Sequence, residues 1–159
     1  MSTILRTPDL ARTVDDYTGV LGFTCRQHIP GVIAVVEHGP VRLQLWACGA
    51  MPGPGERPDP PPRDWHPEQL SVAVCHIQAL FASLRQSILR AVRTSVNGTR
   101  SLNVHRLPEG GPVLQPWGAW EFSFKDIDGH TVHCVDWGLC QRAGARLVRG
   151  NDWQVGEAP

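Results

Sequence analysis

Polar and aromatic side chains alternate with apolar ones in the segment from Val41 to Trp46. A period of two is that of a β-strand with one buried face, so Arg42, Gln44 and Trp46 share the face opposite the apolar residues. Guanidinium and amide groups offer hydrogen bonds, and an indole ring stacks on planar groups. The polar groups on this face are candidates to contact a small molecule, and Trp46 either stacks on such a ligand or fills the core or an interface between two copies.

Three later segments show the same alternation. They place Gln69 with Ser71, Glu121 with Ser123, and Thr131 with His133 on shared faces. Gln69 and His133 add hydrogen-bonding groups to the predicted ligand surface, and Ser71 belongs to the same set. Phe122 and Phe124 alternate with Glu121 and Ser123 and are expected to point the other way, into the core.

The roles of several of these side chains have two interpretations from the residues alone. Glu121 and Ser123 face the predicted ligand surface, or else are solvated surface groups. His133 is a ligand contact, or else a structural histidine with satisfied hydrogen bonds. Trp117 precedes its strand and is a candidate for stacking on a ligand, whereas Trp120 is expected to fill the core or an interface between two copies.

The elements that position these residues are predicted twice along the chain. Leu10 to Leu21 carries apolar residues at helical spacing, with Asp9 placed to cap this helix and Gly22 to end it. A second helical stripe runs from Ile77 to Ile88, directly after the extended run Leu70 to Val74. The chain therefore contains a strand-then-helix unit twice.

Further strands are predicted after each helix. They lie at Phe23 to Gln27, Val32 to Glu37, Val41 to Trp46, Ala119 to Lys125 and Thr131 to Asp136, with one more placed within Val96 to His105. These elements divide the chain into a first module at residues 1–48, a linker or lid rich in proline and glycine at 49–68, a second module at 69–137 and a tail at 138–159.

Composition excludes several classes of protein. Lys and Arg together number 15, as do Asp and Glu, so no net positive charge is available to bind nucleic acid or an anionic membrane surface. No apolar run reaches the ~20 residues that a bilayer requires, and the N-terminus lacks a signal peptide's apolar core, which predicts a cytoplasmic protein. The five cysteines are scattered without Cys-x-x-Cys spacing, so reduced thiols are expected.

Several motifs together resemble the vicinal oxygen chelate superfamily, which contains glyoxalase I, extradiol dioxygenases and bleomycin-resistance proteins. They are Pro8 to Val14 with Tyr17, Val20 to Phe23, Leu70 to Ile77, and Trp117-Gly118 followed by Asp128-Gly129-His130. The resemblance spans roughly residues 3–137 and implies an α+β fold of two βαβββ modules, whose curved mixed sheets surround a cleft. It also implies a homodimer.

Members of this superfamily that bind metal place one ligand on each of four strands. Carried over by motif, these positions are Ser2, Gln44, Gln69 and His133. Divalent cations in such sites rely on imidazole and carboxylate ligands, and only His133 here is a strong one. The resemblance therefore favours no metal cofactor, with Gln44, Gln69 and His133 as the ligands if one is bound.

The favoured function is sequestration of a small, partly aromatic molecule, such as an antibiotic or a metabolite, without metal. The alternative is a lyase, isomerase or dioxygenase that depends on Zn, Ni or Fe, with Glu121 as the nearest candidate base. A third possibility is a non-catalytic interaction protein that uses the proline-rich segment Pro52 to Pro62.

Overall fold

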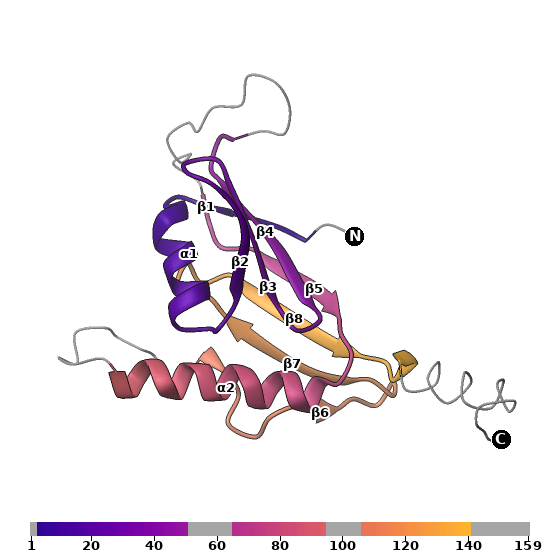
Figure 1. Cartoon of the computed structure of the whole chain (residues 1–159). Coiled ribbons are helices and arrows are strands. Elements are labelled where there is room, and N and C mark those ends of the chain that lie inside the picture. The colour runs from indigo at the N-terminus through magenta and orange to yellow at the C-terminus, as the bar shows by residue number, and fades with distance from the viewer. Residues whose placement is uncertain (1–2, 51–64, 95–105, 141–159) are drawn as a thin grey trace, which may run out of the picture.

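The computed structural model describes residues 3–50, 65–94 and 106–140. The first module begins with strand β1 (Ile4–Thr7) and helix α1 (Leu10–Gly19), followed by β2 (Thr24–Ile29), β3 (Ile33–His38) and β4 (Val41–Ala47). Its sheet has the order β1-β4-β3-β2, with β1 parallel to β4 and the other pairs antiparallel. Figure 1 shows α1 beside this sheet.

The second module repeats this arrangement. Strand β5 (Gln69–Ala73) precedes helix α2 (Ile77–Thr94), and β6 (Val113–Leu114), β7 (Trp120–Lys125) and β8 (Thr131–Asp136) follow. The sheet order is β5-β8-β7-β6, with β5 parallel to β8. The repeated order of elements confirms the predicted α+β fold of two βαβββ modules with mixed sheets, and α2 runs along the second sheet (Figure 1).

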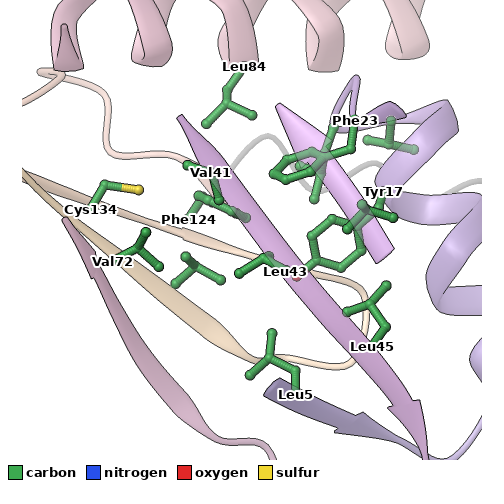
Figure 2. Close-up of a cluster of buried hydrophobic side chains, with 14 of the residues drawn as sticks. Leu5, Tyr17, Phe23, Val41, Leu43, Leu45, Val72, Leu84, Phe124 and Cys134 are labelled. Carbon is green, nitrogen blue, oxygen red and sulfur yellow. The ribbon is translucent and has the colours of Figure 1, made fainter. Parts of the chain in front are cut away.

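The two modules share one apolar core. Leu43 and Leu45 of β4 lie in the same cluster as Phe124 of β7 and Val132 of β8, and all four are fully buried. Figure 2 shows these strands converging with Leu84 of α2 above them. Because the apolar sides of both sheets meet here, the polar residues that alternate with them point away from the core.

A cluster of polar residues joins helix α1 to the turn between β7 and β8. The Tyr17 hydroxyl donates to Asp126 Oδ2 at 2.9 Å, and Asp126 Oδ1 accepts from the backbone N–H groups of Asp128 and His130 at 3.0 Å each. We call Tyr17, Asp126 and His130 the turn cluster. All three are buried, so the cluster holds the two modules together across the core.

Local sequence signals place the first helix correctly. Asp9 caps α1 by accepting from the N–H of Arg12 at 3.1 Å, as predicted. The helix ends at Gly19, and Gly22 follows with a φ of +78°, a conformation that favours glycine. Thus Gly22 turns the chain into β2 rather than ending the helix directly.

Two predictions about the second module need correction. The strand that pairs with β7 is Val113–Leu114, whereas the predicted range Val96 to His105 lies outside the described residues. A strand of two residues is too short to show a period of two, which explains why the sequence pattern missed it. Trp120 is 40% exposed and therefore not a core residue, because it begins β7 beside the exposed Leu114, whereas its alternative place in an interface between two copies stays a prediction.

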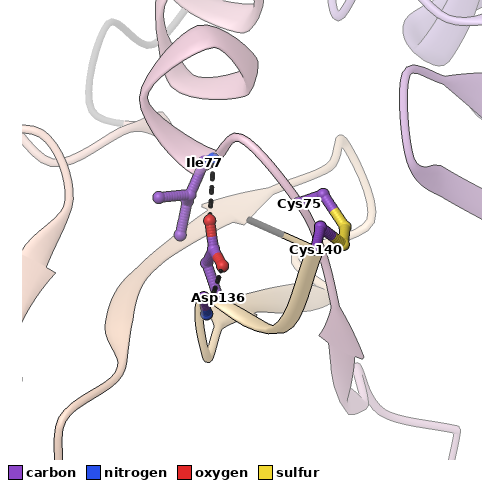
Figure 3. The surroundings of a disulfide bond; sticks show 5 residues. Cys75, Ile77, Asp136 and Cys140 are labelled. Carbon is purple, nitrogen blue, oxygen red and sulfur yellow. Dashed lines mark hydrogen bonds between the residues drawn. A yellow bond between two sulfur atoms is a disulfide. The ribbon is translucent and has the colours of Figure 1, made fainter. Parts of the chain in front are cut away.

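The expectation that all cysteines are reduced is also wrong. Cys75 and Cys140 form a disulfide, with their Cα atoms 6.0 Å apart and 65 positions separating them in sequence. Cys75 follows β5 and Cys140 follows β8, and parallel strands end at the same edge of a sheet. Near this bond, Asp136 accepts from the N–H of Ile77 at the start of α2 (Figure 3). The sheet topology therefore brings together two cysteines whose spacing in the sequence does not indicate a disulfide.

None of the helices in the described ranges has the length and apolar character needed to cross a membrane. The proline-rich segment Pro52 to Pro62 and most of the predicted linker at 49–68 lie outside the described residues, as does the predicted tail beyond Cys140.

Candidate functional site

The central feature of the polar face of the second sheet is a histidine held between a carboxylate and a hydroxyl. His133 Nε2 lies 2.6 Å from Glu121 Oε1, and His133 Nδ1 lies 2.6 Å from Ser123 Oγ. Since a carboxylate only accepts hydrogen bonds, Nε2 of a neutral imidazole carries the proton, and Nδ1 accepts from the Ser123 hydroxyl. The network thus orients the ring and selects one tautomer.

Trp117 completes this group from the loop before β7. Its indole Nε1 donates to Glu121 Oε2 at 2.6 Å, so both oxygens of the buried Glu121 carboxylate accept a hydrogen bond. The indole itself remains 60% exposed. We call Trp117, Glu121, Ser123 and His133 the cleft cluster. Its carboxylate is fixed from two sides while an aromatic ring stays available at the surface.

Strand register explains why these side chains meet. Ser123 of β7 and His133 of β8 are directly opposite in the antiparallel pair, and Glu121 lies two residues earlier on the same face as Ser123. Opposite and diagonal neighbours on one face lie within reach of long side chains. Before the strand, Gly118 has a φ of +92°, which turns the chain and leaves Trp117 beside Glu121.

The cleft cluster borders an open cleft of about 400 Å³. Its walls come from β7, β8 and the segment leading into β6, and its lining residues include Arg106, Gln115, Glu121, Ser123, Lys125 and His133. A volume of this size lies within the range of pockets that hold small molecules. The cleft therefore combines basic, amide and imidazole groups with an adjacent indole.

Three of these lining residues are not among those predicted from the sequence: Arg106, Gln115 and Lys125. Lys125 lies two residues beyond Ser123 on β7, so the alternation that identified Glu121 and Ser123 also contained the signal for it. Arg106 and Gln115 come from a segment without periodic pattern, and only the tertiary structure places them here. Arg106 also forms a 2.6 Å ion pair with the buried Asp16, and burial raises the pKa of Asp16 against the lowering effect of Arg106.

Among the other predicted ligand residues, those on β4 form a separate group, and those on β5 lie beside β8. On β4, Trp46 Nε1 donates to Gln44 Oε1 at 3.1 Å, and Arg42 forms an ion pair with Glu37 at 3.2 Å. Trp46 is only 6% exposed, so it offers little free ring surface within this chain. On the edge strand β5, the exposed Gln69 and Ser71 lie opposite Thr131 and His133. Their roles in binding a ligand stay predictions.

Among the described residues, the donors do not fit a divalent metal at the superfamily position. Gln44 and Gln69 are neutral amides, and Ser2 lies outside the described residues. His133 already shares one nitrogen with Ser123 and the other with Glu121. A metal ligand must present a free lone pair, and the lone pair of neutral His133 accepts from a hydroxyl.

Elsewhere in the described residues, ligand atoms of Asp126, Asp128 and His130 lie within 4.8 Å of one another. His130 Nδ1 accepts from the Glu68 N–H at 2.9 Å, and Nε2 lies 2.7 Å from the Arg6 carbonyl, to which it donates. Both ring nitrogens are thus engaged with the backbone. The His130 ring therefore stabilises the fold through the backbone and offers no lone pair to a metal ion.

Comparison with known proteins agrees with this architecture. The sequence model of the Glyoxalase/Bleomycin resistance protein/Dioxygenase superfamily matches residues 2–134. No functionally curated protein sequence matches the chain.

Three solved structures share the fold. Lactoylglutathione lyase from Agrobacterium tumefaciens is 17% identical, with a TM-score of 0.52 over 87% of this chain and 93% of its own. TioX from Micromonospora sp. ML1 is 17% identical, with a TM-score of 0.52 over 86% and 94%. A bleomycin-binding protein complexed with bleomycin is 18% identical, with a TM-score of 0.53 over 86% and 96%.

At these identities the structural likeness establishes the fold alone, and the match to the family model covers most of the chain. Two repeated βαβββ modules and a cleft on the polar face of the second sheet accord with that match. This chain belongs to the Glyoxalase/Bleomycin resistance protein/Dioxygenase superfamily.

Proposed function

We propose that this protein binds a small, partly aromatic molecule in the cleft of the second module and sequesters it without a metal ion. The single observation that carries the proposal is the cleft cluster, in which an exposed indole lies beside a histidine that is fixed by hydrogen bonds. A site oriented in advance loses less conformational entropy when a ligand binds.

The chemistry of the lining residues supports this choice of ligand. The Trp117 ring offers a stacking surface for a planar group, and stacking of this kind adds roughly 0.5–1.5 kcal/mol beyond area burial. Lys125 and Gln115 line the same cleft and supply polar contacts that fix the orientation of a ligand. Binding of bleomycin by a protein of the same fold makes bleomycin a suitable first probe.

The donors found among the described residues are the reason for proposing a metal-free site. Binding an ion at His133 requires breaking its hydrogen bond to Ser123 or to Glu121. The amides of Gln44 and Gln69 add no negative charge to balance a divalent cation. The proposal therefore assigns binding to hydrogen bonds and stacking.

Intrinsic tryptophan fluorescence during titration with bleomycin tests the proposal. We expect saturable quenching that is unchanged by EDTA, and a weakening of at least about tenfold in both Trp117→Ala and His133→Ala. Arg26→Ala is the matched control, because Arg26 is an exposed residue of β2 in the first sheet and is paired with Glu37. Its affinity should equal that of the wild type.

A metal analysis of the purified protein addresses the competing enzymatic function. Stoichiometric Zn, Ni or Fe that is retained after purification and lost in His133→Ala would contradict the metal-free site. A series of planar antibiotics that all fail to quench fluorescence or raise the melting temperature would contradict the sequestering function itself.

A homodimer remains part of this proposal. The polar face of the second sheet is open in the single chain, and a second copy that covers it would enclose the ligand. Sedimentation equilibrium should give twice the 17.5 kDa mass of the chain. A monomer at all concentrations would show that one chain forms the complete site.

A further inference from the structure

We propose that Ser123 is a nucleophile that becomes acylated by activated esters, with His133 as its general base and Glu121 as the positioning residue. This inference rests on the proposed function to the extent that the same cleft holds the ester. It adds a covalent step that sequestration does not require.

The geometry meets the requirements of an activated serine. A serine hydroxyl is a weak nucleophile until an adjacent base accepts its proton, and a third group must orient that base. Ser123 Oγ lies 2.6 Å from His133 Nδ1, and His133 Nε2 lies 2.6 Å from Glu121 Oε1. Such an arrangement is recognised by geometry and roles rather than by position in the sequence.

Exposure and charge around Ser123 also suit an acyl acceptor. Ser123 and His133 are both partly exposed and line the cleft, so an ester can approach the hydroxyl. Lys125 lies two residues along the same strand face, which is roughly 7 Å in an extended chain. Its ammonium group can stabilise the negative charge that develops on the carbonyl oxygen during attack.

The step conserves atoms and electrons without a further reactant. Ser123 Oγ forms a bond to the carbonyl carbon of the ester, and its proton passes to His133 Nδ1. The bond between the carbonyl carbon and the leaving oxygen then breaks, and the proton on His133 passes to that leaving oxygen. The products are an acylated serine and an alcohol or phenol, with no change in oxidation state.

A second serine and histidine pair in the chain provides an internal control. Ser83 Oγ lies 2.9 Å from His38 Nε2, but His38 Nδ1 donates to the backbone carbonyl of Gly22 at 2.9 Å. A neutral carbonyl stabilises a developing imidazolium less than a carboxylate does. Ser83 should therefore react slowly, although it is also exposed and hydrogen-bonded to a histidine.

Reaction of the full chain with p-nitrophenyl acetate tests the proposal. We expect a burst of p-nitrophenol and one acetyl group per chain, located by peptide mass spectrometry on Ser123. Ser123→Ala should lose this label, His133→Gln should slow labelling by at least about 100-fold, and Ser83→Ala should behave as the wild type.

The role of Glu121 needs a readout that a purely structural effect would not change. Glu121→Gln should lower the labelling rate at saturating ester by about 100-fold while the half-saturating concentration stays the same, because an amide favours the wrong tautomer of His133. An equal change in both quantities would contradict the positioning role.

Acetylation of lysines or of Cys25 in place of Ser123 in the wild-type chain would overturn the proposal, and this result does not depend on whether any variant folds. Fluorescence titration of Ser123→Ala with bleomycin separates the two hypotheses. Retained quenching without acetylation in the wild type refutes only the nucleophile, whereas Ser123 acetylation without quenching refutes only sequestration of bleomycin-like ligands.

Discussion

Two groups, one joining the modules and one within the second module, use the same kinds of side chain for opposite purposes. The turn cluster and the cleft cluster each combine a carboxylate, a histidine and a hydroxyl group. In the turn cluster the Asp126, His130 and Tyr17 side chains are buried, and His130 contacts backbone groups through both nitrogens. In the cleft cluster His133 is partly exposed, with 37% of its side chain accessible, and its two ring nitrogens contact the side chains of Ser123 and Glu121.

This difference shows how the partners of a histidine determine what it can do. Backbone groups cannot release a ring nitrogen without breaking the fold, so His130 is held in a permanent structural contact. A hydroxyl and a carboxylate at the border of a cleft can exchange a proton or rearrange when a ligand arrives. By residue types alone, the two clusters would be equal candidates for a functional site. The difference in burial distinguishes them.

The largest expected effect on stability comes from removing the Asp126 carboxylate from the turn cluster. Asp126→Ala leaves the Tyr17 hydroxyl and the His130 N–H without their acceptor in the protein interior, and the partly buried Asp128 N–H loses the same acceptor. We expect a loss of about 3 kcal/mol in the free energy of unfolding, measured by urea denaturation. A loss below about 1 kcal/mol would contradict the view that this cluster holds the two modules together.

The second prediction concerns the pH dependence of stability. Burial raises the pKa of Asp126 to about 6, against the lowering effects of His130 and of the Tyr17 hydrogen bond. Because the folded pKa exceeds the value of about 3.9 in an unfolded chain, this group favours folding below about pH 4, and the contribution is lost as the pH rises through 6.

Asp126→Asn keeps an acceptor for the backbone N–H groups but cannot ionise. The unfolding free energy of the wild type, relative to this variant, should therefore fall by on the order of 2 kcal/mol between about pH 4 and pH 7. The same unfolding measurement on Glu121→Gln provides the comparison with the cleft cluster. A constant difference between wild type and Asp126→Asn across this range would show that Asp126 ionises without cost in the fold.

The smallest effect is expected in the cleft cluster. Ser123→Ala removes one hydrogen bond from a partly exposed site, so we expect a loss of about 1 kcal/mol or less in the free energy of unfolding. Urea denaturation beside Asp126→Ala makes the contrast direct. Equal losses in the two variants would mean that both clusters are structural and would weaken the proposed site.

The sequence predicted the parts of this fold that depend on local periodicity. The helical stripe with Asp9 as its cap, the alternation of Arg42 and Gln44 with apolar residues, and the inward orientation of Phe122 and Phe124 all follow from spacing. These patterns survive because each element buries one face against a shared core.

The pairing of strands that are distant in sequence could not be predicted from local periodicity. The alternation places Glu121 and Ser123 on one face, but nothing in the sequence states that His133 lies directly opposite Ser123. Sheet register, and the turn that brings Trp117 to Glu121, arise from the whole second module. His133 and Trp117 were therefore predicted as site residues, but the hydrogen bonds that connect them through Glu121 were not.

The disulfide between Cys75 and Cys140 closes a covalent ring that encloses α2, β6, β7 and β8. All four residues of the cleft cluster lie inside this ring. A protease that cuts the chain once within it would therefore leave a single molecule on a non-reducing gel and two fragments after reduction. Nicked protein could keep an assembled cleft until its thiols are restored.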